Sequence, residues 1–525
     1  MSAAPPVNKW LVTVSITFGT LMGALDSSIV NVAMPHIRGT VGATIEEITW
    51  ISTGYIIANV LVMPLTAFLG SFFGQKRLYM FCLGLFLVGS AMCGLARTLP
   101  TLIACRILQG LGAGALQPTE QAILRQTFPP EEQGMAMAVF GVAVMIGPAI
   151  GPTLGGWLTD TYSWPWIFYV NLPVGLLGLV MVFSFVHEPE DVAAAARERA
   201  EKARKHFDWQ GIALMCVGLG ALQTFLEQGD RDDWFNSAFI CALALIAAVS
   251  LTAFVIRELA AEAPAVNLRI LRDRTFTSGT LISAMMFAVL FTNMFFLPLF
   301  MEEMLGFSTL QAGLTVIPRS LVMFLVTPIV GKLYNYVSPR IVVGFGVLVV
   351  AASTYLESHF TLATGASGIY FPLILQGLGF SCLFVPLITA SLSTVTRREL
   401  TDATGLSSLV RQVGGSIGVA IFATVFERDG VRSQASLVAH LGATRSMVVA
   451  RLAMLQSGLA SRGAAAAHQA ALAVLNLMAF GQASVLAFER NFLLQGLCFL
   501  LCLPLLWFLK AARVTPGAEP LVIEG

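Results

Sequence analysis

Asp26 is the residue whose type and position point most directly to chemistry. It is the only charged residue in 11–34, a stretch long enough to cross a bilayer as a helix. A lone carboxylate in hydrocarbon costs about 3 kcal/mol on insertion scales, so such a residue faces a bundle interior or a watery cavity. This position favours a site for a proton, an ion or a substrate. A structural carboxylate that hydrogen-bonds neighbouring helices is the alternative.

Arg106 is the natural partner for this carboxylate. The apolar stretch 100–124 places Arg106, Gln109 and Gly110 on one helical face, at i, i+3 and i+4. An arginine inside a membrane stays charged and needs a partner, and we predict that it reaches Asp26. Two interpretations remain: a structural ion pair, or a pair that separates when a substrate cation arrives.

Glycine and proline recur at four-residue spacing within 134–159. The residues are Gly147, Pro148, Gly151, Pro152, Gly155 and Gly156. A glycine stripe lets another helix approach closely, and the prolines bend their helix and remove backbone donors. The glycines alone are compatible with ordinary helix packing, whereas the Gly-Pro pair repeated one turn apart is a more specific pattern.

The elements that position these residues are membrane spans. The chain of 525 residues is 56% hydrophobic and 12% charged, against roughly 25% charged in soluble domains. We therefore predict an all-α polytopic membrane protein, and a net charge of +1 gives no indication of nucleic-acid binding. Fourteen apolar windows of roughly 20 residues fall at 11–34, 47–70, 78–97, 100–124, 134–159, 166–187, 208–226, 236–256, 276–301, 309–331, 341–360, 369–392, 403–426 and 491–511.

Positive charge predicts the orientation of these spans. Under this count Lys9, Lys76 and Arg397 fall on one side, which the positive-inside rule assigns to the cytoplasm together with both termini. The loop 428–488 then lies outside and is far longer than the other external loops. Its uncharged stretch Gln469–Ala487 is long enough for a fifteenth span. We favour an external, alanine-rich helix pair instead.

The two halves of the chain repeat at an offset of 267 residues. Leu108–Gly112 recurs as Leu375–Gly379, and the same offset maps Gly147 onto Gly414 and Asp26 onto Asn293. We predict two six-helix bundles, 1–187 and 276–525, with two inserted helices in 188–275, a transporter arrangement. Since Asn293 replaces the carboxylate, we expect the charged groups mainly in the N-terminal half. We also expect Asp26 on the cavity side of the interface between the bundles.

Other polar and aromatic residues within the spans are candidates for a substrate pathway. We predict that this pathway includes Asn31, Gln109, Asn293, Phe291, Phe295, Gln376, Arg319, Arg411 and Gln412. The two arginines could equally anchor helices. Phe287, Phe291 and Phe295 share one helical face and would serve either ordinary packing or a wall for hydrophobic compounds.

No group of residues indicates an enzyme. No nucleophile–base pair and no His/Cys metal-ligand spacing is present, so we expect no cofactor and no metal. Gly331-Lys332 lacks the glycines of a phosphate-binding loop and is followed by Leu333. Transport would therefore use an ion gradient or run downhill.

Four motifs together resemble a known family, and they lie in Leu25–Pro35, Arg106–Gly110, Gly147–Gly156 and Trp164–Gly175. They resemble the major facilitator superfamily in its fourteen-helix drug:proton antiporter branch, the EmrB/QacA type. The long external loop is similar to that of EmrB-like pumps of Gram-negative bacteria.

The resemblance implies proton-coupled export of hydrophobic or amphipathic drugs across the bacterial inner membrane, with Asp26 and Arg106 in proton coupling. It also implies a periplasmic adaptor (a membrane fusion protein) and a TolC-type outer-membrane channel as partners. Export of a specific metabolite or siderophore on the same fold is the alternative. The sequence departs from the family at Ser71, where an acidic residue is usual, and at Pro165, where arginine is usual.

Overall fold

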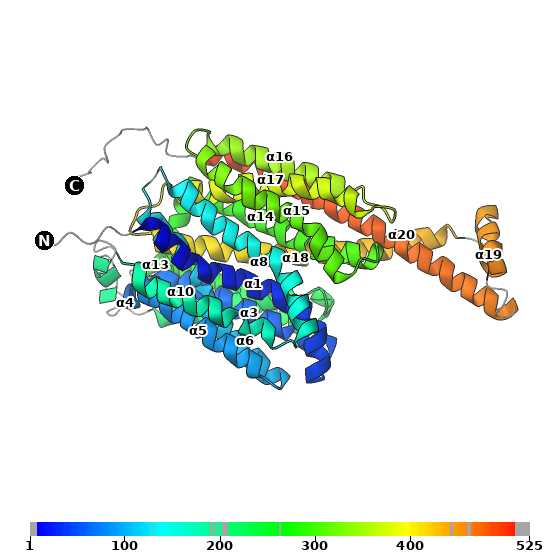
Figure 1. The fold of residues 1–525 in the computed structure, drawn as a ribbon, viewed down its shortest axis with the longest axis horizontal. Coiled ribbons are helices and arrows are strands. Elements are labelled where there is room, and N and C mark those ends of the chain that lie inside the picture. Colours follow the sequence, from blue (N-terminus) through cyan, green and yellow to red (C-terminus); the bar gives the residue numbers. More distant parts are fainter. Residues whose placement is uncertain are drawn as a thin grey trace.

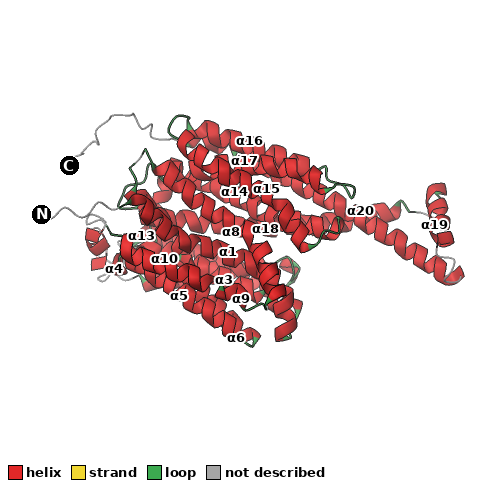
Figure 2. Cartoon of the chain, in the orientation of Figure 1, coloured by secondary structure: helices red, strands yellow, loops and turns green. Residues whose placement is uncertain are grey.

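The computed structural model describes residues 8–129, 131–188, 193–194, 196–198, 200–201, 208–261, 264–441, 445–458 and 464–509. Within these residues the regular elements are helices packed side by side in an elongated bundle (Figures 1 and 2). Fourteen helical segments of the described chain are long and apolar enough to cross a membrane. This confirms the predicted number of spans and the all-helical fold.

Six spans form the N-terminal half. They are α1 (Lys9–Val41), α3 with α4 (Trp50–Val62, Thr66–Phe73), α5 (Gln75–Leu95), α6 with α7 (Leu99–Gly114, Leu116–Thr127), α8 (Gln133–Thr161) and α10 (Asn171–Phe185). The one-turn helices α2 (Ile45–Ile48) and α9 (Trp166–Tyr169) lie between spans. The second span is interrupted by a 3₁₀ turn at Met63–Leu65, where Pro64 lacks a backbone donor.

Two inserted spans and six C-terminal spans follow. The inserted spans are α12 (Trp209–Gln228) and α13 (Ala238–Ala260). The C-terminal spans are α14 (Arg274–Leu299), α15 (Thr309–Leu333), α16 (Pro339–Glu357), α17 (Ala366–Ser391), α18 (Leu400–Ala439) and α20 (Ala464–Leu500). The short helix α19 (Ser446–Gly458) and 3₁₀ turns at Trp234–Asn236, Leu268–Arg272 and Leu503–Phe508 complete the described elements, with a π-helical turn at Phe300–Met304.

Consecutive spans alternate in direction, which defines two ends of the bundle. We call the end that holds Lys9 and Leu509 the terminal face and the end that holds α19 the tip face. At the terminal face Lys9 pairs with Glu132 at the start of α8, and Arg340 donates to the Leu509 carbonyl at 2.7 Å. In Figure 1 α19 lies at the end of the bundle opposite to the one where α1 begins.

The described residues of the segment 428–488 are largely helical, as predicted, but they do not form a separate helix pair. Instead α18 continues for 40 residues and α20 for 37, each longer than the roughly 20 residues that span a bilayer. Both helices project beyond the bundle and carry α19 at the tip (Figure 1). The uncharged stretch Gln469–Ala487 is part of α20, so it adds no fifteenth span.

The internal repeat is visible in helix packing. A Cβ on Gly110 of α6 would collide with the Tyr55 carbonyl of α3, and a Cβ on its repeat mate Gly377 of α17 would collide with the Arg319 carbonyl of α15. Both positions demand glycine because another backbone lies against them. The two halves therefore use the same close contact at matching positions.

The inserted spans lie beside the two bundles. Met215 and Leu219 of α12 pack with Val60 of α3, and Gln223 donates to Ser416 of α18 at 2.7 Å. α13 is more exposed, with Leu245 and Ile256 about two-thirds accessible. Such an apolar outer surface fits contact with lipid.

Candidate functional site

Asp26 and Arg106 form a buried ion pair inside the N-terminal half. Arg106 Nη1 donates to Asp26 Oδ2 at 2.6 Å, and the two side chains are 1% and 0% exposed. α1 supplies the carboxylate and α6 the guanidinium. The predicted contact between these residues is therefore present.

Two amide side chains complete the shell of Asp26. Gln109 Nε2 donates to Oδ1 at 2.8 Å, and Asn171 Nδ2 donates to the same oxygen at 3.1 Å. Asn171 begins α10 and also donates to Ser90 of α5. The donors include a cation and fill both oxygens, so the environment suits an ionised carboxylate. We did not predict Asn171, although it lies in the recognised motif Trp164–Gly175.

Aromatic rings enclose the Arg106 guanidinium. Its carbon lies 4.2 Å from the ring centre of Tyr55 and 5.7 Å from that of Phe168. Its Nε donates to the Ile51 carbonyl at 3.4 Å, and its Nη1 also donates to Gln109 at 2.6 Å. Rings stabilise a cation whose water has been removed, so the pair is held on every side by protein.

The pair does not line a cavity between the bundles in this state. The hydrogen-bond partners of Asp26 come from α6 and α10, both in the N-terminal half, and its side chain is fully buried. In this conformation Asp26 is enclosed by helices of its own half, and its place on the cavity side of the bundle interface stays a prediction. Gln109, predicted in the substrate pathway, is instead a ligand of the carboxylate.

The glycine stripe of α8 packs against α1 on either side of Asp26. A Cβ on Gly147 would lie 2.6 Å from Ala24, and one on Gly151 would lie 2.7 Å from Ser28. Gly155 meets Ile29 in the same way, whereas a Cβ on Gly156 would have only Val32 at 4.0 Å. The stripe therefore brings the backbone of α8 against the turn of α1 that carries the carboxylate.

We expect Gly151→Ala to lower transport strongly, because the new methyl group would push α1 and α8 apart and displace Asp26. Overpacking of this kind costs about 1–3 kcal/mol. Gly156→Ala is the matched control and should behave as the wild type. The measurement is transport in vesicles at equal protein levels, with thermal stability in detergent. Equal activity of the two variants would contradict this role of the stripe.

The C-terminal half contains a second buried polar cluster, centred on Glu357 of α16. Asn293 Nδ2 donates to Glu357 Oε2 at 2.7 Å, and Gln376 Nε2 donates to Oε1 at 3.1 Å. Arg319 Nη1 donates to the oxygens of Asn293 and Gln376 at 3.1 and 3.0 Å. Glu357, Asn293 and Gln376 are 0% exposed and Arg319 is 6% exposed.

This cluster occupies the position in the second repeat that the Asp26 site occupies in the first, but its carboxylate comes from a different helix of the repeat. The offset of 267 maps Gln109 onto Gln376 and Asp26 onto Asn293, and it maps Ser90 onto Glu357. The C-terminal half therefore also holds a buried carboxylate and arginine, in addition to the Asp26–Arg106 pair of the N-terminal half. We missed Glu357 because it lies close to the end of its apolar stretch; the offset to Ser90 was the available signal.

The other residues predicted for the substrate pathway lie at several separate places in the structure. Arg319, Asn293 and Gln376 belong to the Glu357 cluster. Arg411 is 3% exposed and donates to Ser407, Ser408 and Gln121. Asn31 is exposed, and its side-chain oxygen accepts from Ser52 at 3.4 Å. Gln412 is half-buried, and Phe291 packs against Gly415. Phe295 is 54% exposed.

Hydrogen bonds between the two halves gather toward the terminal face. Gln75 Nε2 donates to Thr401 at 2.8 Å. Arg125 donates to the carbonyls of Thr389 and Leu392 at 2.9 and 2.8 Å. Asn335 and Arg397 add bonds to carbonyls of the N-terminal half. These contacts close the bundle at this end.

The altered family motif has a neutral side chain at Ser71 and an acidic neighbour, Glu188, whose Oε1 accepts from the Gln75 backbone N–H at 3.0 Å. Ser71, where the family usually has an acid, donates to the Phe68 carbonyl of its own helix. The nearby contact between halves is the amide–hydroxyl bond of Gln75 and Thr401.

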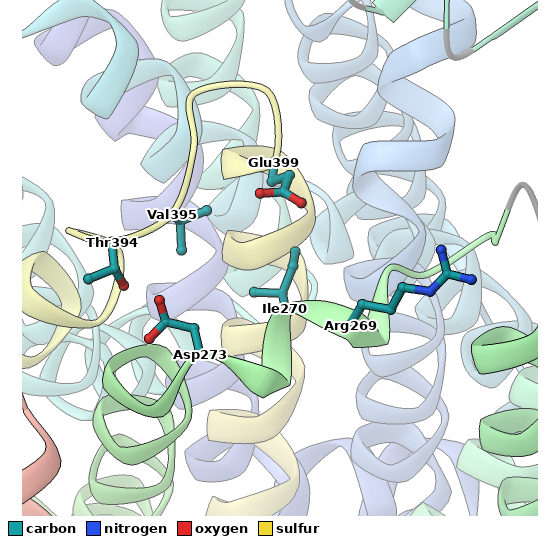
Figure 3. Close-up of a pocket in the computed structure, with 6 residues that line it drawn as sticks. All are labelled: Arg269, Ile270, Asp273, Thr394, Val395 and Glu399. Carbon is teal, nitrogen blue, oxygen red and sulfur yellow. The ribbon is translucent and has the colours of Figure 1, made fainter. Parts of the chain in front are cut away.

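A small pocket of about 200 Å³ lies elsewhere, near the terminal face (Figure 3). Its lining comes from Arg269, Ile270 and Asp273 on one side and from the α17–α18 connection with Glu399 on the other. Ligand pockets usually measure about 300–1,000 Å³. None of the residues that contact Asp26 lines this pocket, so it is not the candidate site.

The chain is similar to proteins from several bacteria. Residues 16–419 match the family model described as Major Facilitator Superfamily. The fatty acid resistance protein FarB of Neisseria gonorrhoeae is 31% identical over 95% of this chain and 96% of its own length. The multidrug export protein EmrB of Haemophilus influenzae is 34% identical over 78% and 79%, and that of Escherichia coli K12 is 30% identical over 95% of each chain.

Solved structures share the fold at low sequence identity. The human organic anion transporter MFSD10 has a TM-score of 0.60 at 14% identity, covering 96% of this chain and all of the other. The proton:xylose symporter XylE has a TM-score of 0.61 at 14% identity, covering 95% of each chain. The family match, the relatives and the fourteen spans agree: this chain belongs to the major facilitator superfamily and is a membrane transporter, not an enzyme.

Proposed function

We propose that this protein is a proton-coupled antiporter that exports hydrophobic or amphipathic toxic compounds across the inner membrane of a bacterium. The observation that carries the proposal is the fully buried Asp26–Arg106 pair, packed against the glycine stripe of α8. The names of the relatives, which refer to multidrug export and to fatty acid resistance, support this substrate class.

The geometry suggests how a proton and a substrate would exchange. With Asp26 ionised, Arg106 has a counter-charge and stays within the N-terminal half. A proton on Asp26 removes that charge and weakens the bond between α1 and α6. Protonation changes the electrostatic energy of the Asp26–Arg106 pair strongly, because the site excludes water and its dielectric constant is low. One proton crossing about 150 mV supplies roughly 3.5 kcal/mol, which sustains a gradient of a few hundred-fold.

The distribution of positive charge supports an orientation with the terminal face in the cytoplasm. Lys9, Lys76 and Arg397 all belong to this end of the bundle. The conformation closed at the terminal face is then one in which the cytoplasmic entrance is sealed. The tip face, with its projecting helices, would lie in the periplasm.

The proposal is tested with the purified protein in proteoliposomes, using ethidium as the probe. An imposed pH gradient should drive ethidium accumulation, and collapse of the gradient should abolish it. Accumulation that is unaffected by the gradient would reject proton coupling. If the pH gradient drives fatty acids but not ethidium, the proposed proton coupling stands and the proposed substrate class changes.

The projecting tip suits a periplasmic adaptor, and through it an outer-membrane channel. Met447 and Met454 of α19 are 84% and 65% exposed, and Leu477 of α20 is 69% exposed. Exposed apolar side chains on helices that project beyond the bundle indicate a surface that another protein covers. A tip this long has no evident place in the transport pathway.

We expect replacement of Met447, Met454 and Leu477 with glutamine to abolish drug resistance in cells while ethidium transport in proteoliposomes stays unchanged. Glutamine is a good helix former, so the tip should keep its shape. Ser446→Gln with Ser457→Gln, at exposed polar positions of α19, is the control. Full resistance at normal expression would contradict docking. Failure of vesicle transport would assign the tip to the transporter's own pathway.

A further inference from the structure

Glu120 of α7 is a second buried carboxylate in the N-terminal half, and its surroundings differ from those of Asp26. It is 0% exposed. Thr17 Oγ1 lies 3.2 Å from its Oε1, and the Thr20 hydroxyl donates to its Oε2. In the described part of the chain it makes no ion pair, whereas Asp26 has Arg106. Two hydroxyl groups are a weak shell for a buried negative charge.

The hydrogen count at Thr17 favours a protonated Glu120. A threonine hydroxyl has one hydrogen to donate, and the Thr13 carbonyl, at 2.8 Å, is the closer acceptor for it. A carboxylate at Glu120 must compete with the Thr13 carbonyl for this single hydrogen. A neutral carboxylic acid, which donates a hydrogen of its own to Thr17, lets both contacts form at once.

Charged and titratable groups near Glu120 are engaged elsewhere. The Tyr79 hydroxyl of α5 donates to the Ile16 carbonyl. Arg411 of α18 donates to two serines and to Gln121. The other titratable groups on the elements packed against α7 are Lys9, Asp26, His36 and Arg38 of α1, Lys76, Arg77, Cys82 and Cys93 of α5, Cys105 and Arg106 of α6, Asp160 of α8, and Asp402, Glu427, Arg428, Asp429 and Arg432 of α18, with Arg125 on α7 itself.

Glu120 lies between Asp26 and the terminal face. Its partner Thr20 precedes Asp26 by six residues on α1, about 9 Å along the helix. The next residue of α7, Gln121, faces the other half: it donates to Ser408 at 3.5 Å and accepts from Arg411 at 3.3 Å. Separation of α7 from α18 would open the terminal face beside Glu120 and admit water to it.

We propose that Glu120 is a second proton-binding site, through which the proton bound at Asp26 leaves toward the terminal face. The proton passes through water from the carboxylic acid of Asp26 to the carboxylate of Glu120, and then from Glu120 to bulk water when the terminal face opens. The structure then corresponds to the closed stage, with the proton on Glu120 and Asp26 ionised against Arg106. This inference rests on the proposed antiport.

The test compares Glu120→Gln, Glu120→Asp and the wild type in proteoliposomes with ethidium. Glutamine keeps hydrogen bonds to both threonines but holds no transferable proton. We expect Glu120→Gln to keep ethidium counterflow, which needs no net proton movement, and to lose pH-driven accumulation by about tenfold or more. Glu120→Asp should recover part of it. Glu132→Gln, a partly exposed carboxylate at the terminal face, is the control.

The outcomes separate this inference from the proposed function. If wild-type accumulation ignores the pH gradient, antiport itself fails. If the wild type responds and Glu120→Gln accumulates ethidium equally well, the relay is overturned. The relay is also overturned if both Glu120 variants lose ethidium counterflow as well as pH-driven accumulation. Glu120 would then be a structural group that the conformational cycle requires.

Discussion

Replacement of Asp26 with asparagine is expected to abolish pH-driven export while the protein still inserts and folds. Asparagine has the same shape, so Gln109 and Asn171 keep a neighbour at this position. It binds no proton. It also leaves the buried Arg106 cation without a counter-charge, which lowers stability, while the rings of Tyr55 and Phe168 still enclose the guanidinium. The driving force lost is roughly 3.5 kcal/mol for each proton at 150 mV, a few hundred-fold in the substrate gradient.

The measurement is ethidium accumulation under an imposed pH gradient, with membrane insertion checked by the yield of folded protein. Asp160→Asn is the matched control, since Asp160 is an exposed carboxylate of the same half, 3.7 Å from His36. It should transport as the wild type does. Proton-driven accumulation at the wild-type level in Asp26→Asn would exclude Asp26 as a coupling residue.

Replacement of Arg106 with alanine is expected to destabilise the protein as well as to stop transport. Removal of one partner of a buried ion pair leaves an uncompensated charge, at a cost of about 3–5 kcal/mol. The contacts with Tyr55 and Phe168 are lost at the same time. Thermal unfolding in detergent measures the first effect and proteoliposome transport the second.

A double variant separates charge from packing. Asp26→Asn with Arg106→Gln removes both charges, so it should recover much of the stability lost in Arg106→Ala and none of the coupled transport. Arg432→Ala is the control, because this arginine is 75% exposed and should change stability by about 0.5 kcal/mol at most. An Arg106→Ala protein as stable as the wild type would show that the pair is not buried in the dominant state.

The two polar clusters give the halves different chemistry on one framework. In the N-terminal half the cation bonds the carboxylate directly, whereas in the C-terminal half Arg319 reaches Glu357 only through Asn293 and Gln376. The repeat retained the glutamine and the close glycine contact and moved the acidic group to another helix. Both arrangements tie together the helices that surround them.

The sequence by itself determined the number of spans and the Asp26–Arg106 pair. Hydrocarbon tolerates only apolar helices, so the fourteen windows follow from composition. Two opposite charges within neighbouring spans have few ways to be neutralised, which made their contact predictable. The repeat of Leu108–Gly112 indicated the matching bundles for a similar reason, because close helix contacts restrict those positions to small residues.

Only the tertiary structure decided which polar groups meet. The partner of a buried side chain depends on how each helix is rotated and how far it slides along its neighbour, and hydropathy carries neither quantity. It therefore took the structure to place Asn171 on Asp26, to join Glu357 with Asn293 and Gln376, and to set Glu120 against the hydroxyl groups of two threonines. The same holds for the tip. The apolar content of 464–487 predicted a helix, but local sequence did not show that this helix continues into the last span as one element, α20.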